Sequence, residues 1–420
     1  MNKTYHIITI GCQMNKSDSE RIAKYLEDYG FVLEQDKFKA DLIVLTTCGV
    51  RQSAEDRIYG LVPRIKNYNP QAKIILTGCL VDRKDVRRRL KDKVDIWLPI
   101  IKLSGLADIG LPKSHYNSLQ SYLSLSPKYE SSFKAFVPIG NGCNNFCTYC
   151  VVPYARGREI YRDYDEIISE IKDLVIRGYR EITLIAQNVN SYESNGYDFS
   201  DLLKMADQIN GDFWISFATS HPKDMSDKLI QTIKNSRKIC HHVHLPAQAG
   251  DNDVLQAMNR KYTIEHYLEL IKKIRKALPD VNLTTDIIVG FPGETEKQFN
   301  QTKKLFKKAK YDMAYIAQYS PRYGTPAYKL EDNVMAKEKK RREQELIKLL
   351  STALRNNKKY KGLAVKVLVD GQKHDYYIGH TSTHKTVKFI GKPGLIGKFV
   401  NVKINNIEDF GLSGKLINYV

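Results

Sequence analysis

The stretch Gly142-Cys143-Asn144-Asn145-Phe146-Cys147-Thr148-Tyr149-Cys150 decides how this chain is organised. It places three cysteines at C-x3-C-x2-C spacing on one short loop, directly after an apolar run, Phe133–Ile139, that has the pattern of a strand. Cysteine thiolates are the usual ligands of four-iron clusters, so these three can bind three of the four irons. The next cysteine along the chain is the distant Cys240. The spacing therefore predicts a [4Fe-4S] cluster with one iron open to an outside ligand.

Two other interpretations of this loop remain. A structural zinc site normally has four ligands in paired C-x2–4-C or histidine spacings, and here the fourth ligand is missing. Inert buried cysteines are common in proteins, but three of them within eight residues are unusual. We therefore favour the iron cluster and keep zinc as the alternative.

The amino-terminal part of the chain alternates apolar runs with amphipathic stretches. Strands are predicted over His6–Gly11, Asp41–Thr47 and Lys73–Gly78, and helices over Ser17–Asp28 and about Ser53–Lys66. A β-α-β-α-β alternation predicts a doubly wound parallel sheet.

Three further cysteines mark one edge of this predicted sheet. Cys12, Cys48 and Cys79 each lie just beyond the carboxyl end of a predicted strand. In open α/β sheets that edge is the binding crevice, so residues that are distant in sequence can converge there. We expect a second three-cysteine [4Fe-4S] site, the alternative being cysteines that follow strands by coincidence.

From residue 133 the alternation resumes with a longer period. Strands are predicted over Phe133–Ile139, Glu181–Ala186, Trp214–Thr219, His241–Leu245, Asn282–Val289 and Asp312–Tyr319. The clearest helices between them are Tyr164–Arg177, Met225–Lys234, Ile264–Ala277 and Glu296–Lys308. Six βα units predict a partial (βα)6 barrel, whose active site lies at the carboxyl ends of the strands. The Cys143 loop follows the first of those ends.

The remaining segments complete four predicted regions, an α/β domain at 1–115, a linker at 116–132, the partial barrel at 133–357 and a small all-β barrel at 358–420. A charged helix over Ala336–Asn357 is expected to close the partial barrel. His241, His242 and His244 alternate on a strand without a further matching ligand, so we assign them to packing or to substrate contact. Cys240 beside them is interpreted as structural.

The last sixty residues hold five short β-branched runs separated by glycine turns, which is typical of a small oligonucleotide-binding type (OB-like) barrel. This segment has eleven lysines against four carboxylates, with Tyr376, Tyr377 and Phe389 interleaved. Lysines with exposed aromatic rings indicate a single-stranded nucleic-acid surface. The same rings could instead form the core of the barrel.

The overall charge agrees with a nucleic-acid partner. Sixty-six Lys and Arg against 47 Asp and Glu give +19, which favours a polyanion, with an acidic membrane surface as the alternative. No apolar run reaches the ~18 residues of a membrane-spanning helix, and the chain opens with no secretory signal. Seven cysteines, an odd number, argue against a disulfide framework and for metal binding in the cytoplasm.

The Cys143 loop, with Tyr149 before its last cysteine, resembles the signature of radical S-adenosylmethionine (radical-SAM) enzymes. Together, the three parts of the chain resemble the radical-SAM methylthiotransferase family over nearly the whole length, the last part being that family's TRAM domain. Three motifs resemble the transfer-RNA branch that methylthiolates N6-dimethylallyladenosine: Gly11-Cys12-Gln13-Met14-Asn15 with Asp18-Ser19-Glu20-Arg21, Cys150-Val151-Val152-Pro153-Tyr154 with Arg156-Gly157-Arg158, and Thr219-Ser220-His221-Pro222.

This resemblance implies a reaction and its cofactors. The cluster on Cys143, Cys147 and Cys150 would cleave S-adenosylmethionine to a radical that removes the C2 hydrogen of the adenine. The cluster on Cys12, Cys48 and Cys79 would deliver sulfur, and a second S-adenosylmethionine would supply the methyl group. Candidate contacts to S-adenosylmethionine are Tyr149, Gln187, Gly290 and Glu294, the alternative for Gly290 being that it only forms a turn. The implied partners are the anticodon loop of transfer RNA and an electron donor such as flavodoxin or ferredoxin, with the enzyme a monomer.

Two motifs depart from the family pattern. The family's Leu-Pro-Val-Gln-Ser-Gly stands here as Leu245-Pro246-Ala247-Gln248-Ala249-Gly250, and its Ser-Pro-Arg-Pro-Gly-Thr as Ser320-Pro321-Arg322-Tyr323-Gly324-Thr325.

Three other functions stay open. The other branches of the family act on threonylcarbamoyladenosine or on a ribosomal-protein aspartate, and their sequences usually open Gly-Cys-Lys-x-Asn or Gly-Cys-Pro-Lys-Asn. A ribosomal protein is basic and a +19 enzyme would repel it. The most distant alternative is a non-enzymatic, zinc-containing RNA-binding protein.

Overall fold

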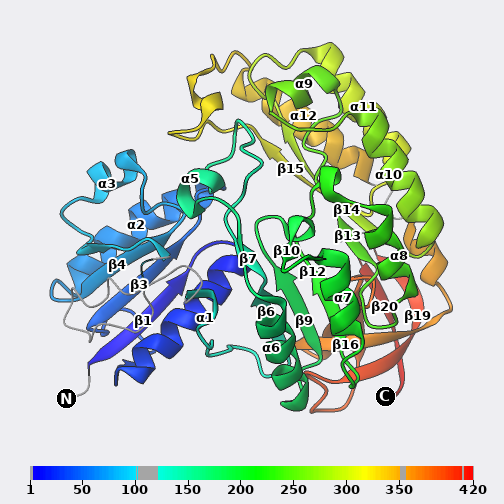
Figure 1. The fold of residues 1–420 in the computed structure, drawn as a ribbon, viewed down its shortest axis with the longest axis horizontal. Coiled ribbons are helices and arrows are strands. Elements are labelled where there is room, and N and C mark those ends of the chain that lie inside the picture. Colours follow the sequence, from blue (N-terminus) through cyan, green and yellow to red (C-terminus); the bar gives the residue numbers. More distant parts are fainter. Residues whose placement is uncertain (1–2, 101, 103–121, 351–355, 409–410, 420) are drawn as a thin grey trace.

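The computed structural model describes residues 3–100, 102, 122–350, 356–408 and 411–419. Three parts are visible in Figure 1: an amino-terminal α/β domain in blue, a central partial barrel from green to yellow, and a small all-β barrel in orange and red. The predicted fold class is confirmed. Among the described residues, the helices are too short or too polar to cross a membrane.

The amino-terminal domain is a parallel sheet in the strand order β2-β1-β3-β4-β5. Its strands are β1 (Thr4–Thr9), β2 (Val32–Leu33), β3 (Leu42–Thr47), β4 (Lys73–Gly78) and β5 (Ile96–Trp97), and its helices are α1 (Gln13–Asp28), α2 (Gln52–Tyr68) and α3 (Lys84–Leu90). The sheet is buried on both faces, since all six residues of β3 are buried. Helix α1 begins at Gln13, directly after Cys12, and not at Ser17 as predicted, and Met14 and Asn15 in its first turn are buried.

The central part contains six parallel strands in two three-stranded sheets, ordered β12-β9-β6 and β13-β14-β15. Its strands are β6 (Lys134–Pro138), β9 (Glu181–Ile185), β12 (Trp214–Phe217), β13 (His242–His244), β14 (Asn282–Val289) and β15 (Met313–Gln318). A parallel bridge between Ile215 and Ile239 joins the two sheets into one partial barrel. All six predicted strands are therefore confirmed.

Helices cover the outside of this partial barrel (Figure 1). They are α6 (Tyr164–Ile176), α7 (Phe199–Asp207), α8 (Asp227–Asn235), α10 (Ile264–Ala277), α11 (Glu296–Ala309) and α12 (Ala336–Leu349). The short helices α5 (Val152–Arg156) and α9 (Asn252–Ala257) lie next to the Cys143 loop instead. Two short ribbons pair β7 (Gly140–Asn141) with β8 (Ile160–Tyr161) and β10 (Glu193–Ser194) with β11 (Tyr197–Asp198). The predicted helix over Ala336–Asn357 is described as α12 up to Leu349, and residues 351–355 lie outside the described chain.

The carboxyl-terminal part is a closed five-stranded barrel in the order β16-β17-β18-β20-β19. Its strands are β16 (Ala364–Lys373), β17 (Tyr376–Thr381), β18 (Thr386–Ile390), β19 (Phe399–Glu408) and β20 (Gly411–Tyr419). Tyr377 and Phe389 are buried and stack in its core, whereas Tyr376 is 39% exposed. Of the three aromatic residues that the sequence offered for RNA contact, only Tyr376 is therefore accessible.

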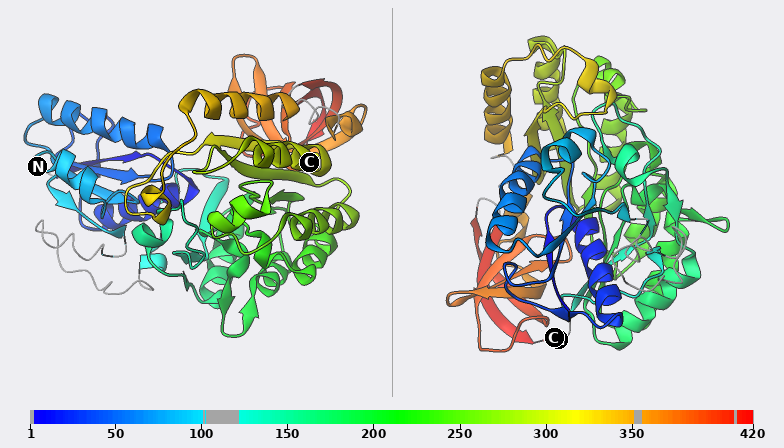
Figure 2. Two further views of the ribbon diagram at one scale, coloured as in Figure 1. Left: turned by 90° about the horizontal axis from the view of Figure 1, so that it is seen from above. Right: turned by 90° about the vertical axis from the view of Figure 1, so that its left-hand side faces the viewer.

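This small barrel is docked against the amino-terminal ends of the strands of the central barrel. Lys366 lies 2.6 Å from Asp212, just before β12, and Lys385 lies 2.8 Å from Asp312, just before β15. The cysteine loop follows the opposite, carboxyl-terminal end of β6. Figures 1 and 2 show the same arrangement, with β16, β19 and β20 at the end of the central barrel away from α5.

The predicted linker between the first two domains lies partly within the described residues. Tyr122, Leu123 and Leu125 are buried in the core of the amino-terminal domain with Ile22 and Leu26 of α1. Residues 116–121 lie outside the described chain, and the domain boundaries stay a prediction.

Glu20 on α1 is expected to make the stability of the protein depend on pH. Burial raises the pKa of its carboxyl to about 7, and its Oε2 has no hydrogen-bond partner in the described chain. The folded state therefore holds the proton more tightly than the unfolded state, so ionisation costs stability as pH rises from about 4.5 to about 7. We expect Glu20→Gln to stabilise the protein by about 1–3 kcal/mol at about pH 8 and by much less at about pH 5. Denaturant unfolding at the two pH values measures this, and an equal effect at both would contradict it.

A candidate iron–sulfur site at the junction of two domains

The first three cysteines lie on the loop from Cys143 to Cys150, between the β7 ribbon and helix α5. The loop leaves the ribbon at Gly142, whose φ is +86°, and a Cβ there would lie 2.1 Å from the carbonyl oxygen of Arg158. Only glycine fits this position. The Gly142 amide donates to Oε1 of Gln187 at 2.6 Å, so Gln187 fixes the start of the loop.

The middle of the loop is fixed by the segment that follows helix α9. Phe146 has a left-handed backbone with φ +47°, and the side-chain amide of Asn259 donates to the carbonyls of Asn145 (3.2 Å) and Phe146 (3.0 Å). The Thr148 amide donates to the carbonyl of Met258 at 3.1 Å. A strained residue held by several partners is typical of a functional site.

Two nitrogen donors point at sulfur atoms of this loop. Asn145 Nδ2 lies 3.4 Å from Sγ of Cys143, and Arg260 Nη1 lies 3.4 Å from Sγ of Cys147. Hydrogen bonds to cluster sulfurs are one of the ways in which proteins tune reduction potential. Arg260 is buried, and the sequence analysis missed it because no motif connects it to a loop more than a hundred residues away.

The second three cysteines lie at the carboxyl ends of three adjacent strands, β1, β3 and β4. A Cβ on Gly11 would lie 3.0 Å from Cβ of Cys48, and a Cβ on Gly49 would lie 3.3 Å from Cβ of Cys79. Burial raises the pKa of the Cys48 thiol, and the neighbouring thiols of Cys79 and Cys12 raise it further. The structure thus brings the three cysteines together, as the strand pattern predicted, while their role as cluster ligands stays a prediction.

The two groups of cysteines face each other across the domain junction. A Cβ on Gly49, beside Cys48, would lie 3.0 Å from the Val151 side chain, which follows Cys150 in the loop. Burial raises the pKa of Cys150, and the thiols near it that raise it further include Cys79. Sulfur atoms of both groups therefore lie close enough to influence each other.

An ion pair between Arg156 and Asp18 joins the two domains beside the cysteines. Arg156 of α5 donates to Asp18 Oδ2 (2.6 Å) and Asn15 Oδ1 (3.0 Å) of α1, and to Asn141 Oδ1 (3.0 Å) of its own domain. Tyr122 donates to the other oxygen of Asp18. Although burial works against the charge, Asp18 holds the pKa of Arg156 well above its ordinary value. This buried network fixes the position of one group of cysteines relative to the other.

A second contact between the same domains comes from the loop after β15. Arg322 donates to Oε1 of Gln52 at 2.5 Å and to the carbonyl of Val50 at 3.0 Å, two residues from Cys48. Its guanidinium also lies 3.8 Å from Glu55, which pairs with Arg83 at 2.8 Å. Arg322 belongs to one of the two motifs that depart from the family pattern, and its role in this contact was not predicted.

The turns that follow the other strands of the central barrel lie at the same end of the barrel as the Cys143 loop. Thr219 after β12 and Gln248 after β13 have left-handed backbones, with φ +67° and +66°. Asn188 Oδ1 and Ser220 Oγ, on the turns after β9 and β12, are buried and have no partner among the described residues. His221 is also buried, and burial followed by the charge of Arg260 lowers its pKa to about 2, so the ring is neutral.

The other residues predicted to bind cofactor have protein partners. Glu294 is buried and accepts from the Gly290 amide at 2.5 Å and from Arg342 of α12 at 2.9 Å. Tyr149 is packed against the core of the central barrel. Cofactor binding by Tyr149, Gln187, Gly290 and Glu294 stays a prediction, and the contacts of Glu294 give it a packing role as well.

The predicted alternatives for the three histidines were packing or substrate contact, and all three have protein partners, His241 through Asp280 at 2.7 Å. His242 and His244 both contact Oγ1 of Thr284 on β14, at 3.2 and 2.9 Å. Cys240 is buried with Trp214 and Phe399 between the central and carboxyl-terminal barrels.

The residues at the domain junction are suited to bind the cofactors that the sequence predicted, two [4Fe-4S] clusters and S-adenosylmethionine. Three thiols lie on each side, and Asn145 and Arg260 supply donors to cluster sulfurs. The unpaired oxygens of Asn188 and Ser220 could accept from a polar cofactor bound on the barrel edge. S-adenosylmethionine carries an ammonium, hydroxyl and amino donors of that kind.

The fold and site define a radical-SAM enzyme with an added domain at each end, and the comparisons with known proteins agree. The Radical SAM superfamily matches residues 137–306, the uncharacterized protein family UPF0004 matches residues 4–99, and the TRAM domain matches residues 358–417. Among solved structures, the radical S-adenosylmethionine methyltransferase TsrM from Kitasatospora setae has a TM-score of 0.53 at 12% identity, over 78% of this chain and 77% of that chain. This likeness concerns the fold.

The family follows from full-length relatives. The tRNA-2-methylthio-N(6)-dimethylallyladenosine synthase of Carboxydothermus hydrogenoformans is 43% identical, covering 99% of both chains. The protein of the same name from Clostridium novyi is 42% identical, over 99% of this chain and 97% of that one. This chain belongs to the tRNA-2-methylthio-N(6)-dimethylallyladenosine synthase family.

Proposed function

We propose that this enzyme methylthiolates C2 of N6-dimethylallyladenosine in the anticodon loop of transfer RNA. The observation that carries the proposal is the meeting of two three-cysteine groups across one domain junction, with Val151 beside Cys150 packed against Gly49 beside Cys48. A single group would suffice for radical chemistry alone. Two groups within reach of one substrate atom suit a reaction that removes hydrogen and then inserts sulfur.

Each group of cysteines would hold one [4Fe-4S] cluster. When bound, the clusters and two S-adenosylmethionine molecules per turnover would supply the electron, the radical, the sulfur and the methyl group. The chain's own residues position these groups: Gly142 and Asn259 fix the Cys143 loop, and Arg156 and Arg322 hold the amino-terminal domain over the barrel edge. An aromatic C–H is too weakly acidic for a side-chain base, which is why a radical is needed.

The substrate base must leave the stack of the anticodon loop to reach this junction, as base-modifying enzymes generally require. We infer that the TRAM barrel holds the phosphates of the transfer RNA, which positions the substrate without specifying its sequence. The enzyme would act as a monomer in the cytoplasm, with a flavodoxin or ferredoxin as electron donor.

The decisive experiment uses anaerobically reconstituted enzyme, S-adenosylmethionine, a chemical reductant and transfer RNA that carries N6-dimethylallyladenosine. We expect the nucleoside to gain the mass of a methylthio group in place of hydrogen. Transfer RNA that carries threonylcarbamoyladenosine and an isolated ribosomal protein, offered in parallel, test the two related alternatives. A mass gain on either of these instead would overturn the substrate assignment but not the reaction.

Metal analysis tests the most distant alternative. Two [4Fe-4S] clusters require about eight irons per chain. Zinc without iron in anaerobically purified protein would support a non-enzymatic RNA-binding role.

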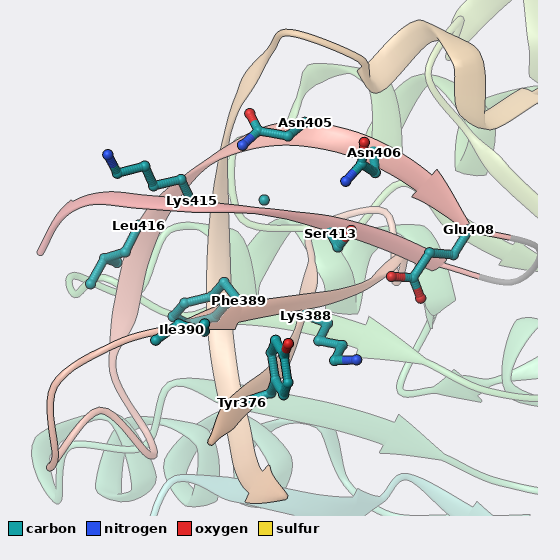
Figure 3. Close-up of a pocket in the computed structure, with 11 residues that line it drawn as sticks. Tyr376, Lys388, Phe389, Ile390, Asn405, Asn406, Glu408, Ser413, Lys415 and Leu416 are labelled. Carbon is teal, nitrogen blue, oxygen red and sulfur yellow. The ribbon is translucent and has the colours of Figure 1, made fainter. Parts of the chain in front are cut away.

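The TRAM barrel carries a pocket that suits the transfer RNA backbone (Figure 3). Tyr376, Lys388, Asn405, Asn406 and Lys415 line it together with one carboxylate, Glu408, and the Lys388 ammonium lies 4.0 Å from the centre of the Tyr376 ring. The combination of lysines, amides and an accessible aromatic ring suits both phosphate and base contact.

We expect Lys388→Ala to weaken transfer RNA binding several-fold, and to lower the slope of log affinity against log salt by about 0.7–0.9 because one phosphate contact is lost. Fluorescence anisotropy at several salt concentrations measures both quantities. Lys272→Ala on α10 removes an exposed lysine of the central barrel and serves as the matched control. An equal loss in both variants would show that Lys388 contributes only general charge.

A further inference from the structure

A cluster of metal-ligand side chains lies where the TRAM barrel meets the central barrel, far from the cysteines. Glu181 begins β9 of the central barrel, His380 lies on β17, and His384 lies in the turn before β18. One donor atom from each of the three falls within 4.8 Å of the others. His380 Nε2 lies 3.3 Å from Glu181 Oε2, and His384 Nε2 lies 3.5 Å from Glu181 Oε1.

These separations suit one ion bound between the two imidazoles and the Glu181 carboxylate. Zinc binds histidine nitrogen and carboxylate oxygen at about 2.0–2.2 Å, so neighbouring ligand atoms lie about 3.3 Å apart. The two nitrogen–oxygen distances, 3.3 and 3.5 Å, are close to that value, with one imidazole facing each oxygen of the Glu181 carboxylate. The side chain of His384 is 27% exposed, so water can reach the cluster as a fourth ligand.

His380 is oriented as a metal-binding histidine would be. Its Nδ1 lies 2.8 Å from Asp370 Oδ2, and its buried Nε2 faces Glu181 Oε2 at 3.3 Å. A histidine that donates one N–H to a carboxylate presents the lone pair of its other nitrogen in a fixed direction, which is the usual arrangement behind metal ligands. Here that direction leads to Glu181.

The charged side chains next to the cluster have a net negative charge. Two carboxylates, Glu181 and Asp370, face one ammonium, Lys134, which lies 3.2 Å from Glu181 and also pairs with Asp370. His242 stacks on His384 with ring centres 4.7 Å apart, and Ser216 Oγ lies 2.9 Å from His384 Nε2. One negative charge is thus left over. Although burial lowers the pKa of His380, hydrogen bonds to Asp370 and Glu181 raise it to about 9, so a proton on His380 balances this charge when no metal is bound. A divalent ion would displace that proton and leave a net charge of +1.

We propose that Glu181, His380 and His384 bind a zinc ion that fastens the TRAM barrel to the central barrel. The ion would bind the Nε2 lone pairs of the two imidazoles and the Glu181 carboxylate. It would release the His380 proton to solvent, and His384 would exchange its contact to Ser216 for the metal. Because the ligands come from two domains, the site would act as a structural clamp. It is independent of the six cysteines and of the reaction proposed for them.

The test uses the anaerobically reconstituted full-length enzyme, so that iron fills the cysteine sites, with zinc chloride as the probe. We expect about one zinc per chain by elemental analysis. Zinc-edge X-ray absorption should give only nitrogen and oxygen neighbours at about 2.0–2.1 Å, since cysteine ligands would add sulfur at about 2.3 Å. Sulfur neighbours, or zinc well below one per chain, would overturn the proposal.

Matched variants locate the ion. We expect His384→Asn to lose zinc while keeping its iron, and His374→Asn, an exposed histidine of the same barrel, to keep both. Zinc should raise the unfolding temperature of the wild type and of His374→Asn but not of His384→Asn. Equal zinc content in the two variants would place the ion elsewhere. Glu181→Gln tests the central-barrel side of the site in the same way, should the histidine variant fold poorly.

Discussion

Cys79→Ser is expected to abolish methylthiolation while leaving the cleavage of S-adenosylmethionine intact. The side chain is buried at the carboxyl end of β4, beside Cys48 and across the junction from Cys150. Serine fits the same space but does not replace a thiolate ligand. The iron content should fall from about eight to about four per chain, because the cluster on Cys143, Cys147 and Cys150 remains. Iron analysis, the release of 5′-deoxyadenosine and the nucleoside mass gain measure the three effects.

Cys240→Ser is the matched control for this experiment, since it makes the same change at a buried cysteine outside both groups. It should keep eight irons and full activity. If Cys79→Ser also kept its iron and still produced the methylthio nucleoside, the second cluster would have to lie elsewhere. Loss of iron from both variants would instead indicate general instability.

Arg156→Met is expected to cost about 3–5 kcal/mol of stability and to separate the two groups of cysteines. Both partners of the Arg156–Asp18 pair are almost fully buried, at 2% and 1% side-chain exposure. Removing the guanidinium leaves the Asp18 carboxylate uncompensated in the domain junction. The midpoint of denaturant unfolding, followed by a probe in the amino-terminal domain, measures the loss.

Two further variants distinguish the contribution of the ion pair to stability from that of side-chain packing. The double change Asp18→Asn with Arg156→Met should recover part of the lost stability, because no unpaired charge is then buried. Lys366→Met breaks a solvent-exposed pair with Asp212 and should cost less than about 1 kcal/mol. If Arg156→Met cost no more than Lys366→Met, the junction would not depend on this pair.

The order of strands and the two cysteine groups could be predicted from the sequence, because both follow from local patterns. Apolar runs define β3 and β14, and the position of Cys48 after β3 follows from chain order alone. The residues that hold the groups together could not be predicted in this way. Arg156 and Asp18 are 138 residues apart, and nothing in the local pattern of either indicates its partner.

Backbone conformation and burial were also beyond the sequence patterns. The left-handed backbones of Phe146, Thr219 and Gln248 occur at residue types that rarely adopt them, so they depend on tertiary contacts such as those of Asn259. Tyr376 and Tyr377 are adjacent and chemically identical, and only the closure of the barrel decides that the second is buried and the first accessible.

The TRAM barrel docks at the amino-terminal ends of the central strands, opposite the cysteines, and this sets a minimum length for a nucleic acid that contacts both. The eight residues of β14 alone extend over roughly 26 Å at about 3.3 Å per residue, so the barrel wall separates the cysteines from the TRAM surface by a distance of that order. A nucleic acid that engages both ends at once has to run along this wall. A hairpin of a few base pairs can occupy one end at a time, which favours an intact, folded transfer RNA over an isolated anticodon arm.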